Sequence, residues 1–144
     1  MFKLLLFCVT IISLNFSLSA QKSIATNVSA PKVIYNEGGV KISTKEVNCI
    51  NKLKNESINN LVLIVENQNN TPVNLKIKHQ LYYDGNCVTC DNEEYNFKYQ
   101  LDAKEKVEGA CDAASNPEFV IFHHMNHGYI EQVLTDAQFQ VVQL

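Results

Sequence analysis

The chain has 144 residues, a net charge of −3 at pH 7, and 12 basic residues that are all lysine. This length predicts a single domain with a sizeable buried core. Arginine is the preferred residue for bidentate contacts with phosphate, so its absence and the mild acidity argue against nucleic acid and anionic membranes as partners. Any aromatic ligand platform would depend on tyrosine or phenylalanine, because the chain has no tryptophan.

The N-terminus has the pattern of a secretory signal peptide. A positive charge precedes an apolar run over 4–16, and small residues follow before a cleavage site after Ser19 or Ala20. The run is shorter than the roughly 20 residues of a membrane-spanning helix. Cys8 lies within it, too early for a lipid anchor. We therefore predict a signal peptide over 1–20 and an exported protein, periplasmic or extracellular, without a membrane span.

Residues 21–37 are mixed and polar, and predict either a flexible lead-in or a short edge strand. A turn is expected at 38–39, where two glycines stand together. Beyond it the apolar positions alternate, but their phase slips by one residue near 43–45, which suggests a β-bulge. Residues 48–60 are polar and typical of turns.

The clearest pattern in the chain is the strict alternation of apolar and polar residues over 73–83, which predicts a half-buried strand. A continuous apolar run at 61–65 predicts a central strand. Further strands are expected over residues 95–101, 104–111, 119–125 and 139–144. No long window has a helical period. We predict an all-β, immunoglobulin-like antiparallel β-sandwich of about seven strands over 38–144.

Four cysteines remain after the leader, and each lies at the end of an expected strand or in the turn beside one: Cys49, Cys87, Cys90 and Cys111. If consecutive strands pair antiparallel, all four lie at the same end of the molecule. An even number of cysteines in an exported chain predicts disulfides. We favour Cys87–Cys90 and Cys49–Cys111, and the other two connectivities remain open.

Two alternatives compete with structural disulfides. A redox Cys-x-x-Cys pair needs its first thiol at a helix N-terminus, whereas here an acidic run and a strand follow Cys90. A zinc site of four cysteines fits the spacing, but an oxidising compartment disfavours it.

A second cluster with ligand chemistry is the histidine-rich segment 123–127. On a strand, His123, Met125 and His127 would share one face, and imidazole with thioether suits copper. The simpler interpretation is a strand end with one packed and one solvated face. His79 lies on the apolar face of its strand, and we expect a core histidine with a hydrogen-bond partner.

The chain resembles small exported bacterial β-sandwich proteins of no known activity. The resemblance rests on Val47-Asn48-Cys49, on the segment Leu81-Tyr82-Tyr83-Asp84-Gly85-Asn86-Cys87-Val88-Thr89-Cys90-Asp91, on Gly109-Ala110-Cys111-Asp112, and on Leu134-Thr135 followed by Phe139. It covers roughly residues 38–144. It implies an exported β-sandwich and supplies no catalytic residue.

The chain contains none of the common hydrolase, phosphate-loop or metalloprotease motifs. We therefore expect a non-enzymatic binding or accessory module without a cofactor, whose partner is a protein or a surface glycan. The alternative from a different class is a soft-metal carrier that binds copper through the histidine-rich segment.

Overall fold

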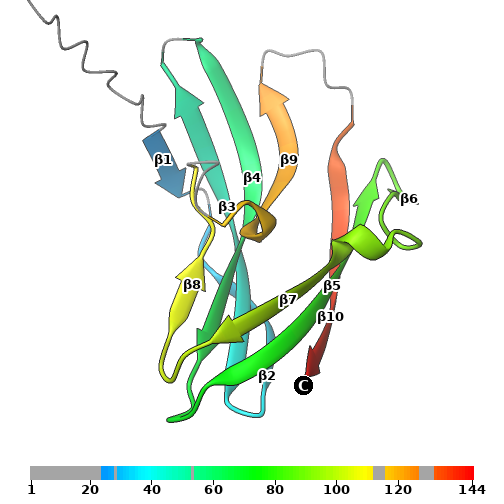
Figure 1. Cartoon of the computed structure of the whole chain (residues 1–144). Helices are drawn as coiled ribbons and strands as arrows, with labels where there is room; N and C mark the ends of the chain where they lie inside the picture. Colours follow the sequence, from blue (N-terminus) through cyan, green and yellow to red (C-terminus); the bar gives the residue numbers. More distant parts are fainter. Residues whose placement is uncertain (1–23, 28, 53, 112–115, 127–131) are drawn as a thin grey trace, which may run out of the picture.

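The computed structural model describes residues 24–27, 29–52, 54–111, 116–126 and 132–144 (Figure 1). The signal peptide expected over 1–20 lies outside these residues. Most of the described chain is β-strand, which confirms the all-β class. The strands are β1 (Ile24–Asn27), β2 (Lys32–Glu37), β3 (Val40–Asn51), β4 (Glu56–Asn67), β5 (Val73–Tyr83), β6 (Asn86–Cys87), β7 (Asn96–Leu101), β8 (Lys106–Glu108), β9 (Val120–Asn126) and β10 (Leu134–Gln143).

Two short 3-10 helices interrupt the strands, η1 (Glu93–Tyr95) and η2 (Pro117–Phe119). Among the described residues, no helix has the length and apolar character needed to span a membrane.

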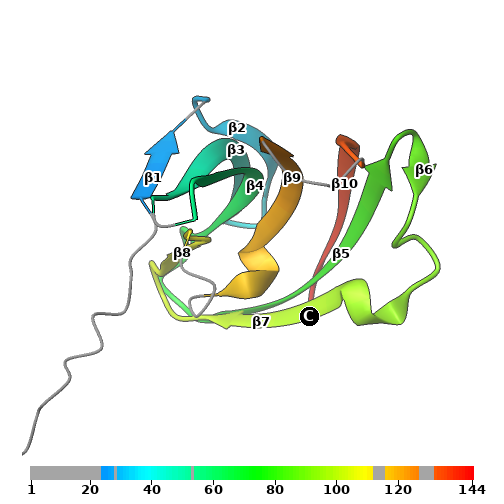
Figure 2. The same cartoon turned by 90° about the horizontal axis from the view of Figure 1, so that it is seen from above.

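The strands form two antiparallel sheets that face each other (Figure 2). In the first sheet, β3 pairs with β4 on one side and with both β1 and β2 on the other, while β8 and β9 pair with the far side of β4. In the second sheet, β5 lies in the centre, with β10 along one side and β6 and β7 along the other. The predicted two-sheet sandwich is therefore confirmed.

The order of the strands leaves one edge open. β4 and β5 are consecutive in the chain but lie in opposite sheets, and they pair with β9 and β10 respectively. The same pairings join strands B with E and C with F in immunoglobulin domains, where a strand G then covers the other side of F. Within the described part of the chain, β5 is the only strand that pairs with β10.

The structure has ten strands where the sequence predicts about seven. The additional ones include β1 and β6, which are too short for their alternation to be recognised. Both β1 and β2 pair with β3, so the first sheet begins before residue 38, the expected start of the domain. Residues 32–37 form an edge strand rather than a flexible lead-in.

The long hairpin of β3 and β4 replaces the turns expected over 48–60. Its tip is confined to the residues between Asn51 and Glu56. Polar side chains near the tip satisfy one another, since the Ser57 hydroxyl donates to the Asn48 side-chain oxygen at 2.6 Å. Half-buried polar pairs between neighbouring strands are not visible from hydrophobic periodicity, and this explains the wrong prediction.

The bulge expected at 43–45 is wrong. β3 pairs with β4 in unbroken register along its whole length, and the irregularity lies instead in β2, between Val33 and Tyr35. The apolar phase of β3 slips because the strand uses both of its faces. Ile42 points into the core between the sheets, whereas Val47, an odd number of residues further on, points to the outer side of the first sheet.

The main core lies between the sheets and is made of buried residues from both: Val40, Ile42, Leu63, Val65, Leu75, Ile77, Leu81, Leu101, Phe119, Ile121 and Leu134. A smaller outer cluster lies on the other side of the first sheet and consists of Val47, Cys49, Val62 and the half-buried Cys111. The sandwich therefore has a second, thinner apolar layer that one disulfide holds in place.

Three turns meet at the lower end of the molecule in Figure 1, where β4 ends. The fully buried Asn67 side chain joins two of them, because its amide donates to the carbonyls of Thr71 and Asp102, both at 2.8 Å. Its oxygen accepts from the backbone N–H of Asn69 at 2.9 Å. The Asn69 amide in turn donates to the Gly38 carbonyl at 2.9 Å, which ties in the turn between β2 and β3.

Candidate functional site: a groove between the two sheets

The four cysteines form two disulfides with the pairing favoured from the sequence. Cys49 on β3 is bonded to Cys111, with 5.5 Å between the Cα atoms, and Cys87 on β6 is bonded to Cys90, with 5.7 Å. The strands β3, β5 and β8, which lead to these cysteines, all run toward the upper end in Figure 1. The two bridges belong to different sheets, so the cysteines do not form a four-ligand zinc site. Two disulfides fit an oxidising, non-cytoplasmic environment.

The Cys87–Cys90 loop clamps the edge of β5. Between the two cysteines, the buried Thr89 hydroxyl donates to the His79 carbonyl and accepts from the Leu81 N–H, both at 2.8 Å. The loop therefore occupies the edge of β5 beyond the end of β7. The residues after Cys90 lead into η1 only after an intervening turn, so the first thiol is not at a helix N-terminus.

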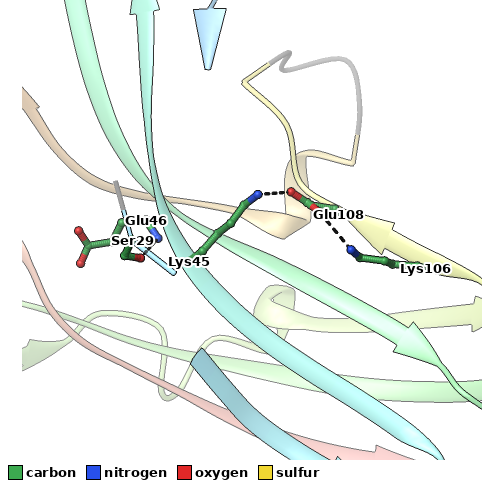
Figure 3. Close-up of polar contacts among 5 residues, drawn as sticks. All are labelled: Ser29, Lys45, Glu46, Lys106 and Glu108. Carbon is green, nitrogen blue, oxygen red and sulfur yellow. Dashed lines mark hydrogen bonds and ion pairs between the residues drawn. The ribbon is translucent and has the colours of Figure 1, made fainter. Parts of the chain in front are cut away.

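The outer side of the first sheet has a cavity of about 440 Å³ beside the Cys49–Cys111 bridge. Its lining is mainly apolar and includes Ile58, Val120 and Phe122. The buried Asn60 amide donates to the Cys49 sulfur at 3.2 Å. On the same side of the sheet, Lys45 pairs with Glu108 (Figure 3).

A second cavity of about 260 Å³ lies in a groove between β2 and β3 of the first sheet and β10 of the second. The groove is lined by Ser29, Lys32, Ile34, Thr44, Lys45, Glu46, Leu61, His123, Leu134, Thr135, Asp136, Ala137 and Phe139. Its lining combines apolar side chains with polar ones and carries both charges. Figure 3 shows that Glu46 points to the opposite side of β3 from Lys45, whose ammonium is paired with Glu108.

The groove closes toward the lower end of the sandwich. There the Gln143 amide donates to the Glu37 carbonyl at 2.9 Å and to the Tyr35 hydroxyl at 3.3 Å, so the end of β10 meets the end of β2. Deeper in the sandwich, the Tyr83 hydroxyl donates to the Phe122 carbonyl at 2.6 Å and joins the two sheets. The walls of the groove are therefore fixed relative to each other.

A β-bulge in β9 brings two histidines together at the upper end of the groove. His123 is the extra residue of the bulge, and its Nδ1 lies 2.6 Å from Nδ1 of His124. The Nε2 of His124 lies 2.6 Å from the Asn59 amide. Burial lowers the pKa of His123, the neighbouring His124 lowers it further, and the carboxylate of Glu46 acts in the opposite direction.

The structure places His123 beside His124 and does not test the set His123, Met125 and His127 that was expected for copper. His123 contacts His124, whereas the side chain of Met125 and the whole of His127 lie outside the described residues. Among the residues that the structure describes, no group of three or more histidine, cysteine, aspartate or glutamate side chains could hold a metal ion.

His79 is a core residue, as predicted from its position on the apolar face of β5. Its ring packs against Phe97 and Phe139, with centroids 4.6 and 5.2 Å away. Burial lowers the pKa of His79 to about 4, so the ring is neutral near pH 7. Its Nε2 has no hydrogen-bond partner among the described residues, which differs from our expectation of a satisfied core histidine.

No family model, curated protein or solved structure matches this chain. The resemblance to exported bacterial β-sandwich proteins therefore stays a prediction. The groove was not foreseen from the sequence, because its walls come from strands that are about 100 residues apart in the chain. The one local signal was the pair of adjacent apolar residues Val33 and Ile34 in an otherwise polar segment.

Proposed function

We propose that this protein is exported and acts outside the cytoplasm as a non-enzymatic binding module, which holds a protein partner in the groove between β2–β3 and β10. The observation that carries this proposal is the groove itself. At this position the inner side of the first sheet has apolar groups that no strand of the second sheet covers in the described part of the chain. Such a surface on a rigid scaffold favours binding.

Two of the three hydroxyl groups that line the groove, those of Ser29 and Thr135, support binding rather than catalysis. The Ser29 hydroxyl accepts from the Glu46 backbone N–H at 2.9 Å (Figure 3). The Thr135 hydroxyl donates to the Tyr82 carbonyl at 3.1 Å. Both are engaged with backbone groups, and within the described part of the chain neither is hydrogen-bonded to a histidine or carboxylate side chain that could activate it as a nucleophile.

Site-specific photo-cross-linking in the producing cells tests the proposal. A photoreactive phenylalanine analogue at Ile34, which lines the groove and is 37% exposed, should form a discrete adduct with one partner. The matched control is the same substitution at Val88, which is also aliphatic and is 52% exposed, but lies on the Cys87–Cys90 loop. Equal adducts from both positions, or none from Ile34, would contradict a groove-specific partner.

Copper binding is a second candidate, favoured by the convergence of the two Nδ1 atoms of His123 and His124. Imidazole nitrogen suits copper. The Asn59 amide donates to Nε2 of His124, which leaves the ring proton on Nδ1, so copper would have to displace that proton to bind there. Two nitrogens are few for a specific site, which makes this proposal second. Titration calorimetry should then show Cu(I) or Cu(II) binding that is lost in His123→Ala/His124→Ala. Equal heats for both proteins would remove the copper proposal.

A further inference from the structure

We infer that the partner enters the groove as an added β-strand that pairs with the free edge of β10; this inference rests on the proposed binding function and specifies the chemistry of the partner. The partner segment would be an extended polypeptide with apolar side chains at alternate positions. Its backbone would complete the second sheet, and its inward side chains would lie against the uncovered part of β2 and β3.

The backbone of β10 is oriented for such pairing. The Leu144 N–H donates to the Asn74 carbonyl at 2.9 Å, so these opposed residues form a hydrogen-bonded pair. In an antiparallel ladder such pairs alternate with pairs whose N–H and C=O groups point away from each other. The register between β10 and β5 is regular from Asp136 to Gln143. Ala137, Phe139 and Val141 therefore direct their backbone groups to the free edge.

The same three residues of β10 turn their side chains toward the core, against which they are partly buried. An incoming strand that pairs with them would place its own alternate side chains on the same inner side of the sheet. There it would meet the apolar groove residues Ile34 and Leu61. Free backbone groups and uncovered apolar side chains thus lie along one line, which is the combination that strand addition uses.

The edge of β10 is also less protected than the edge of β2. Native sheet edges are usually guarded by charge, proline or a bulge. β2 has all three, with Pro31 before its first residue, Lys32 and Glu37 at its ends, and an irregularity after Val33. The ten residues of β10 contain a single charged residue, Asp136, and no proline or glycine. The one register shift of β10 lies before Asp136, so its edge from Asp136 to Gln143 is regular.

The groove favours a lone strand over a second folded copy of the chain. Residues of β2 and β3 line the groove opposite β10, so the first sheet extends beyond the free edge of the second. A whole sheet docking on β10 would collide with this overhang. The cavity of about 260 Å³ is smaller than typical small-molecule pockets, which suits a few side chains of a peptide. The lining stretch from Leu134 to Phe139 corresponds to a strand of roughly 20 Å.

Asp136 acts as a local cover for this edge. Its carboxylate accepts from the Ala137 N–H at 2.9 Å, which is one of the N–H groups that point away from β5. An incoming carbonyl would have to replace that carboxylate. Removing the carboxylate should therefore favour strand addition, whereas removing the N–H should oppose it. These two adjacent substitutions have opposite expected effects, which makes the inference specific.

A tethered strand provides the test. The full chain is extended after Leu144 by a flexible Gly/Ser linker of about 25 residues, which spans roughly 25–30 Å, and by an alternating threonine–valine hexapeptide. Amide hydrogen exchange is then measured at Ala137 and Phe139. We expect exchange slowed by about tenfold or more relative to a fusion in which the hexapeptide has proline at alternate positions. Equal exchange in the two fusions would overturn the inference.

Variants of β10 in the strand fusion complete the design. Ala137→Pro should abolish the protection of Phe139, whereas the matched Ala137→Ser, which keeps the N–H, should retain it. Asp136→Ala should increase the protection, and it keeps the test valid if Ala137→Pro does not fold. If neither Asp136→Ala nor Ala137→Pro changes the protection of Phe139 from hydrogen exchange, the result counts against strand addition. If cross-linking from Ile34 succeeds while this test fails, the binding function stands without strand pairing.

Discussion

The two ends of the sandwich are closed by different chemistry. At the lower end, amide side chains join the turns through neutral hydrogen bonds, with the buried Asn67 at the centre. At the upper end, two disulfides tie loops to the sheets, one across 62 residues of sequence and one across 3. A reductant should therefore loosen the upper end and leave the lower end intact. Three of the measurements below test this difference, and a fourth tests the middle of the sandwich between the two ends.

The largest effect is expected at the upper end, from the long-range bridge. Cys49→Ser/Cys111→Ser should lower the free energy of unfolding by about 4 kcal/mol, because the bridge restricts a long loop in the unfolded chain. Urea unfolding with and without reductant measures this value. A reductant should destabilise the parent chain by at least as much. An unchanged midpoint would show that this bridge does not hold the outer cluster.

Acid should destabilise the middle of the sandwich through His79. Burial lowers the pKa of its ring to about 4 from an ordinary value of 6.5. The unfolded chain therefore binds a proton at a higher pH than the folded chain does. This contribution to stability is complete above pH 6.5, is lost as the pH falls from 6.5 to 4, and amounts to about 3 kcal/mol.

The control for this effect is His79→Leu, which keeps a similar volume between Phe97 and Phe139. Urea unfolding of both proteins at pH 7, 5.5 and 4 measures the difference. The variant should lose less stability than the parent chain over this range. Identical pH profiles would mean that carboxylates or the half-buried His123 dominate the acid response.

At the lower end, Asn67→Ala should cost about 2–3 kcal/mol. It leaves the carbonyls of Thr71 and Asp102 and the N–H of Asn69 without this partner. The matched control is Asn69→Ala, which removes an exposed hydrogen bond to Gly38 and should cost less than half as much. Thermal unfolding of both variants under oxidising and under reducing conditions measures the contribution of the lower end with and without the disulfides of the upper end. Equal costs for the two variants would contradict the central role of Asn67.

The smallest effect is expected from the short bridge. Cys87→Ser/Cys90→Ser should cost about 2 kcal/mol, since a short loop loses little entropy when it is closed. Hydrogen exchange should show faster opening at Leu81, whose N–H is held by Thr89, with no change at Asn67. A cost equal to that of the long-range bridge would show that the clamp on β5 stabilises the whole sheet.

The fold class and the location of the cysteines at one end were predictable from the sequence for simple physical reasons. Alternation over 73–83 has a period of two because successive strand residues face opposite sides, and β5 has those bounds in the structure. The expected directions of consecutive strands indicated only that the four cysteines lie at one end of the molecule. The favoured pairing matches the observed bonds, although the other two connectivities had stayed open.

Local patterns in the amino-acid sequence were enough to predict an all-β chain, disulfide-bonded cysteines and a core histidine at position 79. Three features became apparent only in the folded chain: β3 uses both faces, a bulge turns His123 toward His124, and β2 and β10 form one groove. The two sets of features differ in the distance along the chain over which they are set. Periodicity reports which side of its own strand a residue occupies, whereas the groove depends on which strands pair, and that is set by contacts between segments distant in the chain.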